Sequence, residues 1–348
     1  MIRVLVADDS PTARALLVAL LSAEPGIEVV GEARDGREAV DMAERLRPDV
    51  VTMDVHMPTL DGLAATKEIM THSPRPIIIV SSSTRIGDVE LSLEATRAGA
   101  VLALPKPQGP SVLPHDGEQR HLVNMVKAMS QVKLVRRHGT PTSSPALAAP
   151  ISRPGVARPI RLVAIAASTG GPAALLTILA ALPKQFPVPI LVVQHIARGF
   201  TRGLAHWLGG GTALKVAVAE LGEIARAGTV YVAPDDHHLG IQMGSDHVVR
   251  LTIDSRSEVG AFRPSATYLF RSAASAVGAS TLGVILTGMG DDGVDGLRDL
   301  FAAGGHVLAQ DEATSVIFGM PREAMRAGVV HAVLPLGDIA AQLVELTS

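Results

Sequence analysis

Apolar, strand-like runs alternate with helical stretches along most of the chain, and this alternation most constrains what the chain can fold into. In residues 1–107 the runs cover residues 2–7, 27–33, 50–53, 77–80 and 100–104. Strands that alternate with helices predict a doubly wound α/β fold, a parallel sheet with helices on both faces. The composition, 47% hydrophobic but only 3% aromatic, suits strands that are buried on both faces and built from aliphatic side chains.

A proline-rich stretch divides the chain into two such regions. Residues 138–159 contain five prolines, a composition that favours a semi-extended tether over a packed core. A chain of 348 residues also exceeds one ordinary core. Apolar residues at helical spacing over 119–136 indicate that the last helix of the first region extends into the linker. We therefore expect α/β domains over residues 1–118 and 160–348, joined by a helix extension and linker over 119–159.

One part of the second region departs from the alternation. Residues 237–253 carry Gly244 and Ser245 between two alternating runs, which predicts an antiparallel hairpin. Two adjacent acids and the adjacent His237 and His238 precede it and could resemble a metal site. Adjacent residues of a strand point to opposite faces, so we expect a solvated turn there instead.

Charge, cysteine content and hydropathy exclude several classes of protein. The formal net charge is −3, so neither general attraction to nucleic acid nor a DNA-binding output is expected. Cysteine is absent, which excludes disulfides, thiolate metal sites and a cysteine nucleophile. No apolar run approaches the roughly 18 residues that span a bilayer, and the first residues form a strand ending in acids instead of a signal peptide. We expect a cytoplasmic protein without membrane insertion.

Polar residues follow the strands of the first domain where each strand ends. Asp8 and Asp9 follow the first strand, Asp54 the third, Ser81 the fourth and Lys106 the fifth. The carboxyl ends of parallel strands meet at one edge, and carboxylates gathered there need a hard cation such as Mg²⁺. A carboxylate beside Mg²⁺ can accept a phosphoryl group, whose oxygens a hydroxyl and an ammonium can hold. Any one of these residues could be solvated surface, but five at strand ends indicate a site.

These residues lie in the motifs VLVADDS, MDVHMPTLDG, IIIVSSS and LPKP, and residues 1–107 resemble the receiver domain of bacterial response regulators. The resemblance implies a flavodoxin-like fold in which a histidine kinase phosphorylates Asp54. It also implies that Mg²⁺ is held by Asp9, Asp54 and the backbone carbonyl of His56, with Asp8 assisting. Ala103 departs from the family, which often has Tyr or Phe at that position.

Three strands of the second domain run into residues that a hydrolase could use. Residues 161–167 end at Ser168, residues 189–194 end at His195, and residues 281–287 run into GMGDD, which contains Asp292. At one edge of a parallel sheet these would bring together a hydroxyl, an imidazole and a carboxylate. That is the nucleophile, base and orienting group of acyl-transfer chemistry.

Two other interpretations stay open at this point. A serine before Gly-Gly at a helix start is more often a helix cap or a phosphate cradle. Residues 286–296 also contain GxGxxG after a strand, with Asp311 about 20 residues further on, as in a dinucleotide-binding fingerprint. Asp291 and Asp292 would repel a pyrophosphate there. The alternative is that Asp292 faces His195 while the glycines bring backbone N–H groups near a developing oxyanion. A response regulator whose second domain only binds a nucleotide or a partner therefore remains possible.

The second domain also resembles the catalytic domain of the chemotaxis protein-glutamate methylesterases, the CheB family. The matching stretches are ASTGGP, VVQHI, GFTRGLA, VYVAPDDHHL, RPSATYLF, VILTGMGDDGVDG and AQDEATSVIFGMPREA. The resemblance implies a Ser168–His195–Asp292 triad, with Thr169 near the site and the Met289 backbone N–H in the oxyanion hole. Ala166, the QHIA stretch and Phe262 are small departures from the family pattern.

The same resemblance implies what such a chain would act on. The substrates would be glutamate methyl esters, and glutamines, on methyl-accepting chemotaxis receptors. The phosphodonor would be a histidine kinase of the chemotaxis type, and the second domain would need no cofactor. The tether and the two sites in one chain also suggest that the unphosphorylated receiver covers the crevice at Ser168.

Overall fold

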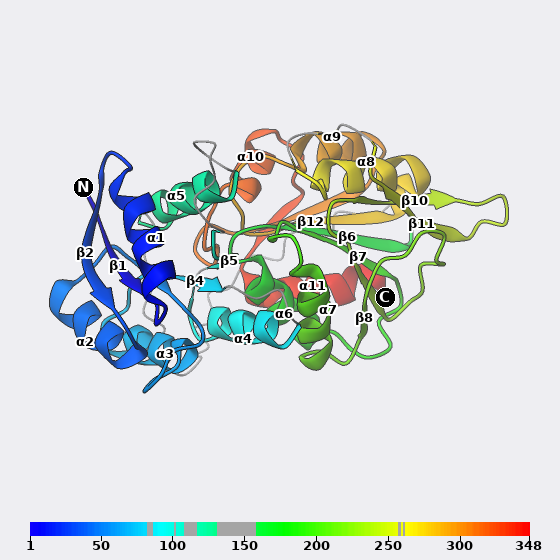
Figure 1. Ribbon diagram of the computed structural model, residues 1–348. Helices are drawn as coiled ribbons and strands as arrows, with labels where there is room; N and C mark the ends of the chain where they lie inside the picture. Colours follow the sequence, from blue (N-terminus) through cyan, green and yellow to red (C-terminus); the bar gives the residue numbers. More distant parts are fainter. Residues whose placement is uncertain (82–85, 101, 108–116, 131–157, 257–258, 260–261) are drawn as a thin grey trace, which may run out of the picture.

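A computed structural model describes the chain except residues 82–85, 101, 108–116, 131–157, 257–258 and 260–261 (Figure 1). Most of the proline-rich linker therefore lies outside the described residues. So does the end of the predicted helix extension, beyond residue 130. The fifth helix is described as α5, Gly117–Met129.

The first sheet has the strand order β2-β1-β3-β4-β5 in the described part of the chain, and every neighbouring pair is parallel. The order reverses between β1 and β3, and this switch point opens a crevice at the carboxyl ends of the strands. Helices cover both faces of the sheet (Figure 1). The elements are β1 (Ile2–Ala7), α1 (Pro11–Ser22), β2 (Ile27–Ala33), α2 (Gly36–Leu46), β3 (Val50–Met53), α3 (Gly62–His72), β4 (Ile77–Ser81), α4 (Ile86–Arg97), β5 (Leu102–Pro105) and α5.

The second sheet is larger, with the order β14-β13-β12-β6-β7-β9-β8 among the described residues, again with parallel neighbours. Its switch point lies between β6 and β12. The elements are β6 (Leu162–Ala167), α6 (Gly171–Ala181), β7 (Ile190–Gln194), α7 (Thr201–Gly210), β8 (Lys215–Val218), β9 (Thr229–Val232), β10 (His238–Met243), β11 (Val249–Asp254), α8 (Ala266–Ala276), β12 (Thr281–Ile285), α9 (Val294–Ala302), β13 (His306–Gln310), α10 (Met320–Arg326), β14 (Ala332–Leu334) and α11 (Leu336–Thr347).

The central strand β6 shows why this sequence forms a buried parallel strand. All six of its residues are buried, and alternate side chains enter different cores. Val163 and Ile165 belong to the cluster that includes residues of α6, α7 and α11. Leu162 and Ala164 belong to the cluster that includes residues of α8, α9 and α10. A strand covered on both faces needs a continuous apolar run, which is the pattern of this segment.

The predicted fold class is confirmed. Both sheets are parallel and doubly wound, and β10 and β11 form the predicted antiparallel hairpin. The strands predicted over 2–7, 27–33 and 50–53 have those bounds in the structure, and the other predicted strands differ by one or two residues. None of the described helices is both long and apolar enough to span a membrane.

The two domains contact each other through their helices. Helix α4 packs on α7, and Val89 and Leu93 share an apolar cluster with Leu204 and Trp207. The Trp207 Nε1–H donates a hydrogen bond to Glu94 Oε1 over 2.7 Å. On the other side, α5 lies near the second domain (Figure 1), close to the edge where β6 and β12 end.

Candidate active site

Ser168 lies where β6 ends and α6 begins. Its backbone N–H donates to the Thr287 carbonyl over 3.0 Å, which joins the end of β6 to the loop after β12. Gly170, with φ +78°, turns the chain sharply into the helix, and Pro172 occupies the first turn. A Cβ built on Gly288 would lie 2.7 Å from the Ser168 Cβ, so glycine is needed for this close approach.

Gln194, at the end of β7, ties the neighbouring strand ends together. Its buried Nε2 donates to the backbone carbonyls of Ser168 and His195, both over 2.8 Å. This residue was not predicted to belong to the site. A polar residue at the end of an otherwise apolar strand was the available signal.

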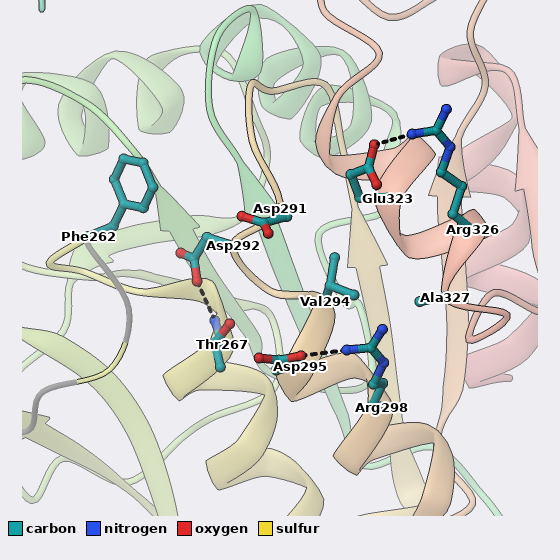
Figure 2. Close-up of a pocket in the computed structure, with 10 residues that line it drawn as sticks. All are labelled: Phe262, Thr267, Asp291, Asp292, Val294, Asp295, Arg298, Glu323, Arg326 and Ala327. Carbon is teal, nitrogen blue, oxygen red and sulfur yellow. Dashed lines mark hydrogen bonds and ion pairs between the residues drawn. The ribbon is translucent and has the colours of Figure 1, made fainter.

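His195 and Asp292 are brought together from opposite sides of β6. The His195 Nε2 lies 2.9 Å from Asp292 Oδ2. The same carboxylate accepts hydrogen bonds from the Ser265 hydroxyl (2.9 Å) and from the backbone N–H groups of Ala266 (2.7 Å) and Thr267 (3.1 Å). Figure 2 shows Asp292 bound to Thr267 at the start of α8. None of the three donors at the start of α8 was predicted.

The surroundings of Asp292 determine which nitrogen of His195 carries the proton. Burial alone would raise the pKa of this carboxyl, but the His195 hydrogen bond and the two backbone N–H groups lower the pKa to about 2. The carboxylate is therefore ionised at neutral pH and can only accept. Neutral His195 must then hold its proton on Nε2, which leaves Nδ1 as the acceptor.

The other nitrogen of His195 is available for chemistry. Nδ1 is buried and has no hydrogen-bond partner among the described residues. The Phe262 ring stacks on the imidazole, with centroids 4.4 Å apart and planes 11° from parallel. A stacked ring holds the imidazole plane, so the free lone pair of Nδ1 keeps a fixed direction. Such an acceptor is what a general base needs.

Ser168, Thr169, His195 and Met289 line one cavity of about 400 Å³. Among the described residues, neither the Thr169 nor the Met289 backbone N–H donates a hydrogen bond. Two free N–H groups beside a hydroxyl could bind the negative oxygen of a tetrahedral intermediate. The first domain lines the opposite side of the cavity with Leu102, Ala103, Leu104, His121, Asn124 and Met125.

A second cavity of about 440 Å³ adjoins the other side of Asp292 (Figure 2). It is lined by charged side chains, including the Asp295–Arg298 pair (2.6 Å) and the Glu323–Arg326 pair (2.9 Å). Exposed pairs of this kind stabilise the fold little. A substrate that extends past Asp292 on this side would meet charged side chains, in contrast to the apolar lining of the first cavity.

The glycine-rich loop does not have the hydrogen bonding of a phosphate cradle. The Gly288 N–H donates to the Ile317 carbonyl (3.0 Å), and the Gly293 N–H donates to Thr267 Oγ1 (2.8 Å). The carboxylate of Asp311, which the fingerprint would assign to a ribose, accepts from the Thr314 N–H over 3.0 Å. These groups are engaged within the protein, which disfavours the dinucleotide-binding interpretation.

The acidic residues of the first domain also meet at one edge. Ligand atoms of Asp8, Asp9 and Asp54 lie within 4.8 Å of one another. Lys106 Nζ lies 2.8 Å from Asp8 Oδ2 and 2.9 Å from Asp54 Oδ2. Burial raises the pKa of Asp54, opposed by Lys106. Burial would lower the pKa of Lys106, but its bonds to the two carboxylates outweigh burial and raise it.

The donor set fits a divalent cation, because three carboxylates face a single ammonium and leave negative charge to be neutralised. The backbone around Asp54 is tightly constrained, since a Cβ on Gly62 would lie 1.9 Å from the Asp54 carbonyl oxygen. Ser81 is buried at the end of β4, and its carbonyl accepts from the Lys106 N–H over 2.7 Å. His56 follows Asp54 by two residues in the same loop.

One prediction for the second domain is wrong. His238 does not lie in a solvated turn but is 1% exposed, begins β10 and stacks on Tyr268 with centroids 4.8 Å apart. Its Nδ1 accepts a hydrogen bond from the Ser265 N–H over 3.1 Å. His237, in the bend just before β10, is half-buried. The residues that bury His238 come from the start of α8, far along the chain, so this position could not be predicted from the local sequence.

Comparison with known proteins identifies the family of both domains. Residues 163–343 match the family described as CheB methylesterase, and residues 4–116 match the response regulator receiver domain. A relative from Myxococcus xanthus (strain DK1622), named protein-glutamate methylesterase/protein-glutamine glutaminase 4, is 51% identical and covers 98% of this chain and 96% of its own. A relative from Anaeromyxobacter dehalogenans (strain 2CP-C), named protein-glutamate methylesterase/protein-glutamine glutaminase 3, is 51% identical. The match covers 99% of this chain and 98% of its own.

A solved structure extends the comparison to three dimensions. The crystal structure of the Thermotoga maritima CheB methylesterase catalytic domain is 41% identical, covers 54% of this chain and 100% of that chain, and gives a TM-score of 0.53. The resemblance predicted from sequence motifs is thus confirmed: the chain belongs to the CheB methylesterase family and carries a response regulator receiver domain.

Proposed function

We propose that the chain is a phosphorylation-controlled protein-glutamate methylesterase and protein-glutamine glutaminase of the cytoplasm. Its substrates would be glutamate methyl esters and glutamines on methyl-accepting chemotaxis receptors. The observation that carries the proposal is the buried His195–Asp292 pair, with a free Nδ1, in the cavity that Ser168 lines. The names of the relatives support the reaction.

The first half of the proposed reaction forms an ester between Ser168 and the substrate. His195 Nδ1 takes the Ser168 hydroxyl proton as the oxygen attacks the γ-carbonyl carbon, and Asp292 stabilises the imidazolium that results. The Thr169 and Met289 N–H groups donate to the oxyanion. The C–O bond to the methoxy group then breaks. Protonated His195 gives its proton to the leaving oxygen, and methanol departs.

The second half regenerates the enzyme. His195 takes a proton from water as the water oxygen attacks the acyl carbon, the bond to Ser168 Oγ breaks, and the proton returns to Ser168. Glutamate is released. With a glutamine substrate the same steps release ammonia in place of methanol.

Control by phosphorylation would begin at Asp54. The proposed phosphodonor is a chemotaxis histidine kinase, and Mg²⁺ held by Asp8, Asp9, Asp54 and the His56 carbonyl would neutralise charge during the transfer. Ser81 and Lys106 would hold the phosphoryl oxygens. Because the receiver lines the cavity opposite Ser168, loosening its contacts would open the cavity to a receptor.

The deciding experiment measures methanol release from methylated receptor. Wild type is compared with Ser168→Ala, each with and without a small-molecule phosphodonor and Mg²⁺. We expect wild type to release methanol faster with the donor, and Ser168→Ala to release none above background. An Ala variant with wild-type activity would exclude Ser168 as the nucleophile.

A second experiment tests the control separately. We propose that the catalytic domain spans residues 160–348, so a fragment that starts at Ile160 lacks the receiver and should exceed the activity of the unphosphorylated full-length chain. The Asp54→Ala variant of the full chain should not respond to the donor. Equal rates for fragment and unphosphorylated full-length chain would exclude inhibition by the receiver.

A further inference from the structure

The first turn of α8 surrounds the Asp292 carboxylate. Oδ1 accepts from Ser265 Oγ and the Thr267 N–H, and Oδ2 accepts from the Ala266 N–H and His195 Nε2. Each oxygen thus has two donors, and three of the four donors come from consecutive residues. A carboxylate bonded in this way cannot rotate without breaking bonds at both oxygens.

Ser265 has a further role at the same place. Its side chain is fully buried, and its Oγ also accepts from the Tyr268 N–H over 3.4 Å as the N-cap of α8. Its backbone N–H donates to the Nδ1 of buried His238, which stacks on Tyr268. Because this Nδ1 accepts a hydrogen bond from a backbone N–H, it carries no proton of its own, so His238 is neutral and adds no second charge behind the carboxylate.

We propose that Ser265 is a positioning residue of the reaction: its hydroxyl fixes and partly neutralises Asp292 so that His195 remains an unprotonated base, and the residue is itself held by the α8 cap and by the bond from its backbone N–H to His238. The proposal rests on the proposed function for its kinetic consequences, but the geometry concerns the His195–Asp292 pair itself. The role is indirect, since none of the described contacts of Ser265 is with Ser168.

The Ser265 hydroxyl and His195 both interact with the negative charge of the Asp292 carboxylate, so loss of one interaction strengthens the other. A neutral donor on Oδ1 and the positive end of the helix dipole both attract the Asp292 charge. Without the hydroxyl, more of that charge acts on His195, and the imidazolium becomes more favourable. The acid limb of the pH–rate profile should therefore move to higher pH. Loss of one charge-assisted hydrogen bond should lower kcat/KM by roughly tenfold.

Other ionisable groups near the pair stay the same in every variant. His121 and Arg263 line the cavity on the Ser168 side, and burial lowers the pKa of His121. Asp291 is the sequence neighbour of Asp292. The groups that line the cavity on the other side are Asp295, Arg298, Glu323 and Arg326. A shift that follows the Ser265 substitution alone therefore reports the lost hydroxyl.

The test compares Ser265→Ala and Ser265→Gly with wild type in the full-length chain, with phosphodonor and Mg²⁺. Alanine removes both the hydroxyl and the helix cap, whereas glycine preserves most of the cap stability. We expect the two variants to differ in Tm but to share the same loss of kcat/KM and the same upward shift of the acid limb. Ser265→Thr, which restores a hydroxyl, should return both values toward wild type if it folds.

A second measurement does not depend on activity. Imidazole NMR signals of the histidine-labelled chain, with His195 assigned by loss of its signal in His195→Gln, report the pH at which this ring becomes doubly protonated. That pH should rise in both Ser265→Ala and Ser265→Gly. An unchanged value together with a lowered Tm would overturn the proposal and leave Ser265 as a helix cap only. Absence of methanol release from wild type would instead count against the proposed function, and the NMR result would still decide the role of Ser265.

Discussion

At the scale of single residues, Asp292 decides the tautomer of neutral His195 because its ionised carboxylate can only accept hydrogen bonds. It directs the His195 proton to Nε2 and leaves Nδ1 free. Three donors from the start of α8 hold the carboxylate in place. The tautomer is therefore determined by the fold before any substrate arrives.

Replacing Asp292 by asparagine should abolish this assignment. The Asn amide can donate to His195 Nε2 and so favour the tautomer with the proton on Nδ1, which cannot act as a base. We expect kcat for methanol release to fall by about 10⁴-fold, as for the equivalent change in a serine protease triad.

The matched control for that change is Asp291→Asn. It removes the same charge one residue away, at a side chain without a hydrogen bond among the described residues. It should keep most of the wild-type activity. Similar losses in the two variants would show that net charge, and not the tautomer, matters.

At the scale of elements, the loop between β12 and α9 depends on close backbone approach. A Cβ on Gly288 would lie 2.4 Å from Met320 Sδ and 2.7 Å from the Ser168 Cβ. Both distances are too short for real contacts, so an added methyl group must displace both the Met320 side chain and Ser168. The loop thus couples the position of Ser168 to the packing of α10.

The Gly288→Ala variant should lose both stability and activity. Overpacking of this kind typically costs about 1–3 kcal/mol of unfolding free energy, and displacement of Ser168 by about 1 Å should lower kcat by roughly 10²-fold. Gly337→Ala in α11 is the control, since nothing lies within 4 Å of its added Cβ. Equal activity of the two variants would contradict the close approach at Ser168.

The sequence predicted most of these elements and the ends of the strands, because buried parallel strands are continuous apolar runs with polar residues just beyond them. It did not predict the contacts made across elements. Three side chains become part of the site only when distant segments pack together: the Ser265 hydroxyl, the Phe262 ring and the buried His238 ring. A serine before α8 indicates a helix cap, but its bond to Asp292 depends on tertiary structure.

Two stacked histidines make stability depend on pH: His306, which begins β13, and His331, which precedes β14. Burial, and then His331, lower the pKa of His306 to about 4, and the two rings stack with centroids 4.3 Å apart. The unfolded chain, with an ordinary pKa of 6.5, binds this proton more readily. Stability from the neutral ring is present above pH 6.5 and is lost progressively as pH falls from 6.5 to about 4.

Urea unfolding followed by the fluorescence of Trp207, the single tryptophan, measures this loss. The His306→Phe variant keeps an aromatic ring against His331 without a titrating group, so its unfolding free energy should fall less over the same pH range. An equal fall in both proteins would assign the acid sensitivity to other groups.

At the scale of the whole molecule, the receiver contacts the second domain at several places among the described residues, including Val316 and Ile317, which pack against the receiver core, and two further places matter for control. Helix α4 packs on α7 through the bond between Glu94 and Trp207, while β5 and α5 line the cavity at Ser168. The first place is not part of the cavity at Ser168, whose lining includes no residue of α4 or α7, so it can hold the receiver without entering the site. The second place is where a substrate would have to enter.

Weakening the first contact should therefore raise activity without phosphorylation. Glu94→Ala removes the acceptor of the Trp207 N–H, and we expect methanol release by the unphosphorylated chain to rise several-fold, with a smaller additional response to the donor. Glu44→Ala, an exposed acid on α2, is the control and should behave as wild type. An unchanged basal rate for Glu94→Ala would show that α4 does not hold the receiver in place.

Because Ser168 and the β5–α5 side of the receiver line a single cavity, influence between the two domains must run in both directions. Coupling between two binding events is reciprocal. A receptor segment that fills the cavity would hold β5 and α5 away from Ser168, and so favour the receiver arrangement that phosphorylation also favours. Bound receptor should raise the equilibrium constant for phosphorylation of Asp54 by the same factor as phosphorylation raises the affinity for receptor. The substrate would then be an input to the receiver as well as the target of its output.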